Sequence, residues 1–138
     1  PAEQAPLPCD LDIRLLTGPE LLTGSTRLKA GTATKMALNI LSTGVMVRLG
    51  KVYGNRMVDV SASNSKLVDR SLRILQDLAA VDRGHGLQLL NDAEGSVKTA
   101  LVMAAAGLSV DQAKTVLQQH DQQLRPALQS CGASLSQP

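Results

Sequence analysis

The residue types best suited to bind a ligand gather in one short segment, residues 23–32, which reads TGSTRLKAGT. A helix-forming sequence follows at once, and a helix N-terminus exposes about four unpaired N–H groups and about half a positive charge. Ser25 and Thr26 add hydroxyl donors to this end of the helix. Arg27 and Lys29 add full positive charges. Together these groups predict an anion site that suits a phosphate, although the same residue types serve helix capping and tight turns, which leaves a purely structural loop as the alternative.

One carboxylate, Glu20, lies close to this segment in the motif Gly-Pro-Glu at residues 18–20. The motif follows a predicted strand, and parallel-sheet proteins place ligand-binding groups where a strand gives way to a loop. Glu20 is therefore a candidate to bind the ligand or to orient a catalytic group. The alternative is structural, with the carboxylate accepting hydrogen bonds from loop N–H groups or pairing with Arg27 or Lys29. No motif assigns it as a general base.

Two elements are predicted to hold this loop in place. Residues 11–15, LDIRL, alternate apolar and polar side chains with a period of two, which predicts a short strand. After a loop over residues 21–31, good helix formers dominate from Thr32 to Leu49, and Gly50 ends the helix. Apolar side chains cover so much of this helix that we expect it to be buried on most sides.

The remainder of the chain is predicted to form a helical module that follows an irregular connection over residues 51–63. An amphipathic pattern begins at Asn64, which can cap a first helix. Three shorter helices form the core of the module and are expected at about 82–91, 95–106 and 109–120. A capping box of Ser109 and Gln112 opens the last of them. Residues 126–138 are predicted to be a frayed tail.

Composition and charge exclude several classes of protein. The 138 residues are 43% apolar and 19% charged, which is the balance of a folded globular protein. A net charge of +2 and a single aromatic residue, Tyr53, argue against a nucleic-acid partner. The longest uncharged, mainly apolar stretches run for about a dozen residues, short of the roughly 20 that a membrane span needs, so no membrane partner is expected.

Cysteine and histidine placement bears on compartment and metals. Cys9 and Cys131 lie near opposite ends of the chain without a CxxC spacing, which favours a reducing cytoplasm. His85 and His120 fall in different predicted helices with no further ligand at metal spacing, so we expect no metal site. Neither GxxxxGK[ST] nor GxGxxG is present, and no nucleotide cofactor is predicted.

Residues 17–60 read TGPELLTGSTRLKAGTATKMALNILSTGVMVRLGKVYGNRMVDV. This segment resembles the signature region of the N-acetylmuramic acid 6-phosphate etherases, whose relatives include the glucokinase regulatory proteins of animals. The resemblance rests on the runs GPE, TGSTR, KAGT and MVRLGKVYGN, and it continues more loosely through residues 64–70 and 96–113. Arg56 departs from the pattern, because the family usually has an apolar residue there.

The resemblance implies a fold and a reaction. Residues 1–60 would be the C-terminal portion of a sugar isomerase (SIS) domain, a parallel α/β sandwich that holds a sugar phosphate. Residues 61–138 would be a small helical module similar to a ubiquitin-associated (UBA) domain, so that the chain itself is mainly α with an α/β parent. The family cleaves the D-lactyl ether of N-acetylmuramic acid 6-phosphate to give N-acetylglucosamine 6-phosphate and D-lactate, and it uses no metal or cofactor.

The resemblance places the two catalytic glutamates of the family upstream of this chain, which leaves the chain with no catalytic residue of its own. We therefore expect the chain alone to be inactive as an etherase. The residues that the loop chemistry and the resemblance together assign to the sugar phosphate are Glu20, Ser25, Thr26, Arg27 and Lys29. SIS folds build their sites near dimer contacts, which predicts a homodimer.

A second class of function stays open at this point. The same fold in the glucokinase regulators binds a sugar phosphate without catalysis and reports its presence to a protein partner. Those regulators carry two tandem SIS units, whereas this chain carries at most the end of one. This difference favours the etherase and leaves the regulatory module as the alternative.

Overall fold

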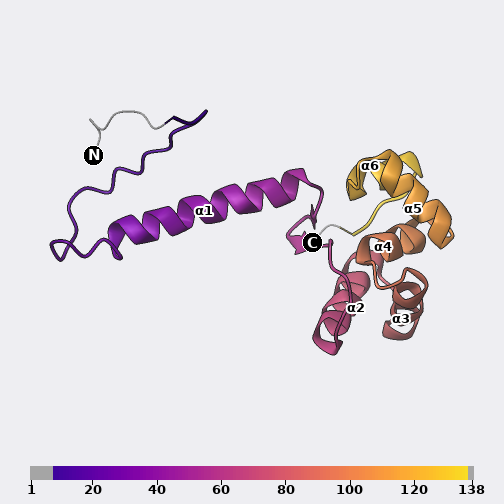
Figure 1. The fold of residues 1–138 in the computed structure, drawn as a ribbon. Helices are drawn as coiled ribbons and strands as arrows, with labels where there is room; N and C mark the ends of the chain where they lie inside the picture. Colours follow the sequence, from indigo (N-terminus) through magenta and orange to yellow (C-terminus); the bar gives the residue numbers. More distant parts are fainter. Residues whose placement is uncertain (1–7, 137–138) are drawn as a thin grey trace. The chain divides into compact units, whose positions relative to one another are not determined.

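The computed structural model describes residues 8–136, and over this range the chain is mainly helical. The described residues contain six helices and one two-stranded sheet (Figure 1). The prediction of a mainly α chain is confirmed. The chain divides into two compact units, one ending at Val45 and one starting at Met46, and each is described by itself.

The N-terminal part of the first unit differs from the prediction. The strand expected over residues 11–15 is wrong, because this segment has no regular secondary structure and its side chains are exposed. A strand is stable only when a neighbouring strand takes its backbone hydrogen bonds, and within residues 8–136 none pairs with this segment. A period of two shows which side chains share a face, but it does not show whether a second strand is available to pair with the segment.

Helix α1, Lys29–Arg48, confirms the long predicted helix and begins at Lys29 rather than Thr32. Gly50 follows its end with φ of +68°, a left-handed conformation that glycine adopts without strain. A side chain at this position would also approach Gln123 to 2.9 Å. The expected burial of α1 is not met, since none of its residues is buried within the described chain. An apolar pattern records what a helix can bury, whereas burial itself requires a surface that covers it.

A short hairpin lies in the segment predicted to be an irregular connection. Strand β1, Val52–Tyr53, pairs antiparallel with β2, Arg56–Met57, across a turn at residues 54–55. Tyr53 and Val58 are both buried in the core of the second unit. The hairpin therefore belongs with the helices that follow it, although the sequence put the boundary between domains at residues 60–61.

The helices of the second unit follow the predicted order closely (Figure 1). They are α2 (Ser65–Ala79), α3 (Arg83–Asp92), α4 (Val97–Ala106), α5 (Val110–Gln119) and α6 (Leu124–Ser130). Asn64 caps α2 by accepting a hydrogen bond from the Leu67 N–H at 3.0 Å. Ser109 and Gln112 form the predicted capping box at the start of α5.

The frayed tail predicted over residues 126–138 is wrong for residues 126–136, and residues 137–138 lie outside the described residues. Helix α6 occupies the start of this region and buries Leu124, Ala127 and Leu128. Beyond it, Leu135 is buried and the Ser136 N–H donates to the Leu78 carbonyl at 2.9 Å. Pro126 misled the sequence interpretation, because proline is tolerated in the first turn of a helix, where its missing N–H has no partner to lose.

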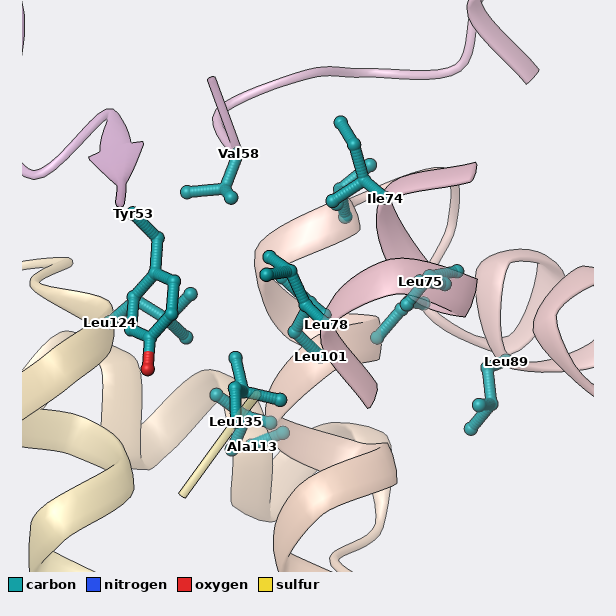
Figure 2. Packing of buried hydrophobic residues seen from close by; sticks show 14 of the residues in the cluster. Tyr53, Val58, Ile74, Leu75, Leu78, Leu89, Leu101, Ala113, Leu124 and Leu135 are labelled. Atoms are coloured by element: carbon teal, nitrogen blue, oxygen red, sulfur yellow. The ribbon is translucent and has the colours of Figure 1, made fainter. Parts of the chain in front are cut away.

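The core of the second unit is one apolar cluster built from the hairpin region and the helices. Figure 2 shows side chains of this cluster, among them Tyr53, Leu75, Leu101 and Leu124. Helix α4 packs against α2, α3, α5 and α6, and residues 97–102 in it are all buried. Because side chains on every face of this part of α4 are covered, the polar Lys98 and Thr99 included, α4 is the central element of this unit.

Within residues 8–136 no single helix is long and apolar enough to cross a membrane. Helices α4 and α5 reach the required length and hydropathy only as a pair, and a bend of 106° separates them.

Candidate functional site

The segment that the sequence singled out forms a compact loop ahead of α1. The Ser25 N–H donates to the Leu22 carbonyl at 3.0 Å, and the Leu28 N–H donates to the Ser25 carbonyl at 3.2 Å. Gly24 adopts φ of +81° and lets the chain turn between Leu22 and Ser25. These successive turns place Ser25, Thr26 and Arg27 directly before the first turn of the helix.

Glu20 closes this loop onto the start of α1. One carboxylate oxygen, Oε2, accepts a hydrogen bond from the Lys29 N–H at 2.9 Å. The other, Oε1, accepts from the Ala30 N–H at 3.0 Å. The carboxylate therefore pairs with two of the backbone donors that a helix N-terminus leaves open, and its negative charge lies at the positive end of the helix dipole.

This pairing favours the ionised form of Glu20. The hydrogen bonds from the Ala30 and Lys29 N–H groups, together with the Lys29 charge, hold the pKa of the Glu20 carboxyl below its usual range. A carboxylate with a lowered pKa is a weaker base, which favours a role in holding the loop over one in removing a proton.

The other backbone groups at the start of α1 are also satisfied from within the loop. The Gly31 N–H donates to the Thr26 carbonyl at 2.8 Å, and the Thr32 N–H donates to the Leu28 carbonyl at 3.0 Å. The Lys29 ammonium donates to the Pro19 carbonyl at 2.9 Å. The sequence assigned these amides and the Lys29 charge to a phosphate, but in the structure the chain itself uses them.

The five predicted site residues are thus brought together, with unequal roles. Glu20 and Lys29 form the internal bonds that shape the loop. Thr26 and Arg27 are exposed, and Ser25 is half-buried. Their hydroxyl and guanidinium groups are the part of the loop that can reach an anion, because a guanidinium and two hydroxyls supply charge and directed donors to phosphate oxygens.

The structure also shows an ionic network that sequence reasoning missed. The nearly buried Lys98 ammonium lies 3.3 Å from an Asp59 carboxylate oxygen and donates to the Gln122 carbonyl at 3.1 Å. The other Asp59 oxygen pairs with Lys51 at 2.8 Å. This network joins the hairpin region, α4 and the turn between α5 and α6. No local pattern could reveal it, because the partners lie far apart in the sequence.

The two histidines considered above as metal ligands, His85 and His120, lie in different elements. His85 lies in α3, and its backbone N–H donates to the capping carboxylate of Asp82 at 3.0 Å. His120 follows the end of α5. Within residues 8–136 there is no group of three or more His, Cys, Asp or Glu side chains arranged to hold a metal ion.

Comparison with known proteins identifies a family for this arrangement of loop, helix and helical unit. No family model matches the chain. Over 137 residues the chain is 80% identical to the N-acetylmuramic acid 6-phosphate etherase of Synechococcus sp. (strain CC9605), an alignment that covers 99% of this chain and 43% of the relative. The etherase of Parasynechococcus marenigrum is 72% identical over 137 residues, again 99% of this chain and 43% of the relative. The etherase of Trichodesmium erythraeum is 58% identical over 134 residues, 97% of this chain and 44% of the relative.

These alignments extend through both units of the chain and through the loop that precedes α1. The chain spans less than half the length of these curated relatives. Sequence identities of 58% to 80% across almost the whole chain are far higher than a shared fold alone produces. The chain therefore belongs to the N-acetylmuramic acid 6-phosphate etherase family.

Proposed function

We propose that this chain is part of an enzyme that cleaves the D-lactyl ether of N-acetylmuramic acid 6-phosphate, giving N-acetylglucosamine 6-phosphate and D-lactate. In this proposal residues 1–60 contribute to a SIS domain that binds the sugar phosphate, and the helices from residue 61 onward form a UBA-like module. Residues 1–7 and 137–138 of these two segments lie outside the described residues. The names of relatives that match almost the whole chain support the proposal.

The observation that carries the binding role is the closure of the loop by Glu20. Its two hydrogen bonds to the start of α1 fix the backbone on either side of Ser25, Thr26 and Arg27. A preorganised loop loses little conformational freedom when a ligand arrives, so more of the contact energy appears as affinity. The exposed Arg27 guanidinium is the group placed to meet the phosphate charge.

Arg27→Ala is the direct test of this role. A hydrogen bond to a charged group contributes about 1.5–3 kcal/mol, so we expect about ten- to a hundredfold weaker binding of N-acetylmuramic acid 6-phosphate. The measurement is calorimetric titration of the sugar phosphate into a full-length etherase that carries this segment. Unfolding midpoints of the same samples should stay close to that of the unsubstituted protein, because Arg27 is exposed.

Lys35→Ala is the matched control, since Lys35 is an exposed basic residue of α1, the helix that follows the loop. Its affinity for the sugar phosphate should equal that of the unsubstituted protein. If Arg27→Ala and Ser25→Ala both bind the sugar phosphate normally while their unfolding midpoints fall, the loop is structural and the binding role is refuted.

We also propose that the protein is a homodimer, with α1 contributing to the contact. Large apolar side chains of this helix are at least half exposed, among them Met36, Leu38, Ile40, Leu41 and Val45. Soluble monomers rarely leave contiguous apolar patches larger than a few hundred Å² open to water. Light scattering at micromolar concentration should therefore give a mass above 14.5 kDa, the mass of one chain. A mass equal to that of one chain would contradict self-association.

A cytoplasmic location is the remaining part of the proposal. Cys9 and Cys131 are both free thiols, the first exposed and the second half-buried. Reducing compartments keep thiols in this state, which supports the proposed location.

A further inference from the structure

The end of α1 is held by a contact with the turn between α5 and α6. The Gln123 side-chain amide, Nε2, donates a hydrogen bond to the Arg48 carbonyl at 2.8 Å, although the two residues are 75 positions apart in the sequence. Arg48 is the last residue of α1, and Gln123 directly precedes α6. Both residues belong to the unit that starts at Met46. The contact is therefore made within the helical unit, to which the last turn of α1 belongs.

The backbone at this helix end explains why a side-chain donor is needed. The N–H groups of Gly50 and Lys51 each donate at 3.0 Å to a carbonyl in the last turn of α1, which is the pair of bonds of a Schellman motif. A helix end leaves four carbonyls without an intrahelical donor, so these two bonds serve only part of the set. The Arg48 carbonyl takes its donor from Gln123.

Gly50 gives the Gln123 side chain the room to reach this carbonyl. Gly50 is buried, and a Cβ atom added to it would lie 2.9 Å from both the Cδ and the Oε1 atom of Gln123. The same Cβ would lie 3.0 Å from the Gln122 carbonyl oxygen. Such distances are too short for non-bonded atoms. Any other residue at position 50 would therefore push the Gln123 side chain out of its hydrogen-bonded position.

The turn that presents Gln123 has a conformation that needs support. Asp121 and Gln122 have φ of +51° and +60°, in the left-handed region that residues other than glycine rarely adopt. Such residues keep this conformation only where the surrounding contacts fix it. One of these contacts is the nearly buried Lys98 ammonium, which donates to the Gln122 carbonyl at 3.1 Å. Lys98 thus holds the turn, and the turn carries the residue that holds α1.

Helix α1 depends on contacts at its ends, and the contact with Gln123 is one that water can replace. None of the residues of α1 is buried within the described chain, so side-chain packing there does not hold the helix in place. A single hydrogen bond between neutral groups contributes little net free energy in water. The Gln123 side chain is half-buried and Arg48 is exposed, so both partners can be hydrated when they separate.

We propose that Gln123 is a latch with two positions. In the closed position its amide holds the Arg48 carbonyl and fixes the last turn of α1 to the helical unit. In the open position the side chain turns to water, and the last turn of α1 moves about Gly50, which is the hinge. The latch uses neither the loop at residues 23–32 nor a sugar phosphate, so it stands apart from the function proposed above.

The first test uses the unsubstituted 138-residue chain labelled with ¹⁵N, so it does not depend on the folding of a variant. The side-chain amide of Gln123 should be ordered in ¹⁵N relaxation measurements and protected from exchange with water, because it is hydrogen-bonded. Gln129 is the internal reference, since it is an exposed glutamine of α6. Its side-chain amide should be mobile and unprotected. A Gln123 side-chain amide as mobile as that of Gln129 would overturn the latch.

Gln123→Ala should raise the hydrogen-exchange rates of the Gly50 and Lys51 amides about three- to tenfold, the change expected for loss of one neutral hydrogen bond. Gln129→Ala is the matched control and should leave both rates unchanged. The amides of Leu67 and Gln112 should also keep their rates, because these amides are bound at the starts of α2 and α5 and open locally. Unchanged rates at Gly50 and Lys51 in Gln123→Ala would overturn the proposal. An equal rise at Leu67 and Gln112 would do the same, since it would mark a general loss of stability.

Gly50→Ala tests the closed position through the residue that gives Gln123 its room. The added Cβ should displace the Gln123 side chain, so the side-chain amide of Gln123 should become as mobile as that of Gln129. Gly107→Ala is the matched control, because Gly107 has a similar φ of +65° and a Cβ there would meet nothing within 4 Å. It carries the same backbone strain without the clash and should leave the Gln123 signal unchanged. A Gln123 signal that stays ordered in Gly50→Ala would contradict the latch.

Discussion

Leu101→Ala should lower the free energy of unfolding of the helical unit by about 2–5 kcal/mol, the range measured when buried leucines are truncated. Leu101 is fully buried on α4, the helix that packs against four others. Removing its isobutyl group loses apolar burial and leaves a cavity that rigid neighbours on several sides cannot fill. A domain is stable by only about 5–15 kcal/mol, so this substitution removes a large share of the total.

Chemical denaturation followed by circular dichroism measures this loss. Leu87→Ala is the matched control, because Leu87 lies on the neighbouring helix α3 but is 42% exposed. We expect it to cost less than about 1 kcal/mol, since little apolar area returns to water. Equal losses for the two variants would contradict the central position of α4 in the core.

Asp59→Ala should produce the second large effect, about 2–3 kcal/mol of destabilisation. Removing one partner of a buried ion pair costs about 3–5 kcal/mol, because the other charge stays buried without compensation. Lys98 is only 5% exposed, so its ammonium cannot simply return to water. The effect is reduced because the Asp59 side chain is 37% exposed and because Lys98 keeps its bond to the Gln122 carbonyl.

The same carboxylate makes this contribution dependent on pH. The hydrogen bond from Lys51, supported by the Lys98 charge, holds the pKa of Asp59 below its ordinary value of 3.8. A group with a lowered folded-state pKa stabilises the fold above its unfolded pKa, and that stabilisation is lost as pH falls through the folded value. The difference in unfolding free energy between the unsubstituted chain and Asp59→Ala should therefore stay constant from about pH 7 to about pH 5 and shrink below about pH 4.

Urea unfolding at a series of pH values measures this difference directly. Asp92→Ala is the control for removal of a carboxylate, since Asp92 is exposed at the end of α3. It should change stability by less than about 0.5 kcal/mol at any pH in the series. A difference between the unsubstituted chain and Asp59→Ala that does not decrease on acidification would show that ionised Asp59 does not hold Lys98.

Local sequence determined the helical elements of this protein. The Asn64 cap, the Ser109–Gln112 capping box and the left-handed glycines at the helix ends act over three or four residues. Signals of this range are complete in the sequence, because every atom that they involve is close in the chain. The loop before α1 could be singled out for the same reason, since Ser25, Thr26 and Arg27 are consecutive in the chain.

Tertiary structure alone decided what the partners of these residues are. The roles of Glu20 at the start of α1 and of Asp59 beside Lys98 depend on which donor the folded chain brings to each carboxylate. The strand predicted from the period-two pattern at residues 11–15 was wrong for the same kind of reason, because a strand needs a second segment to pair with and no local pattern specifies one. Periodicity gives the face that a residue shares with its neighbours. Only the packed chain determines what that face meets, because this depends on contacts between residues distant in sequence.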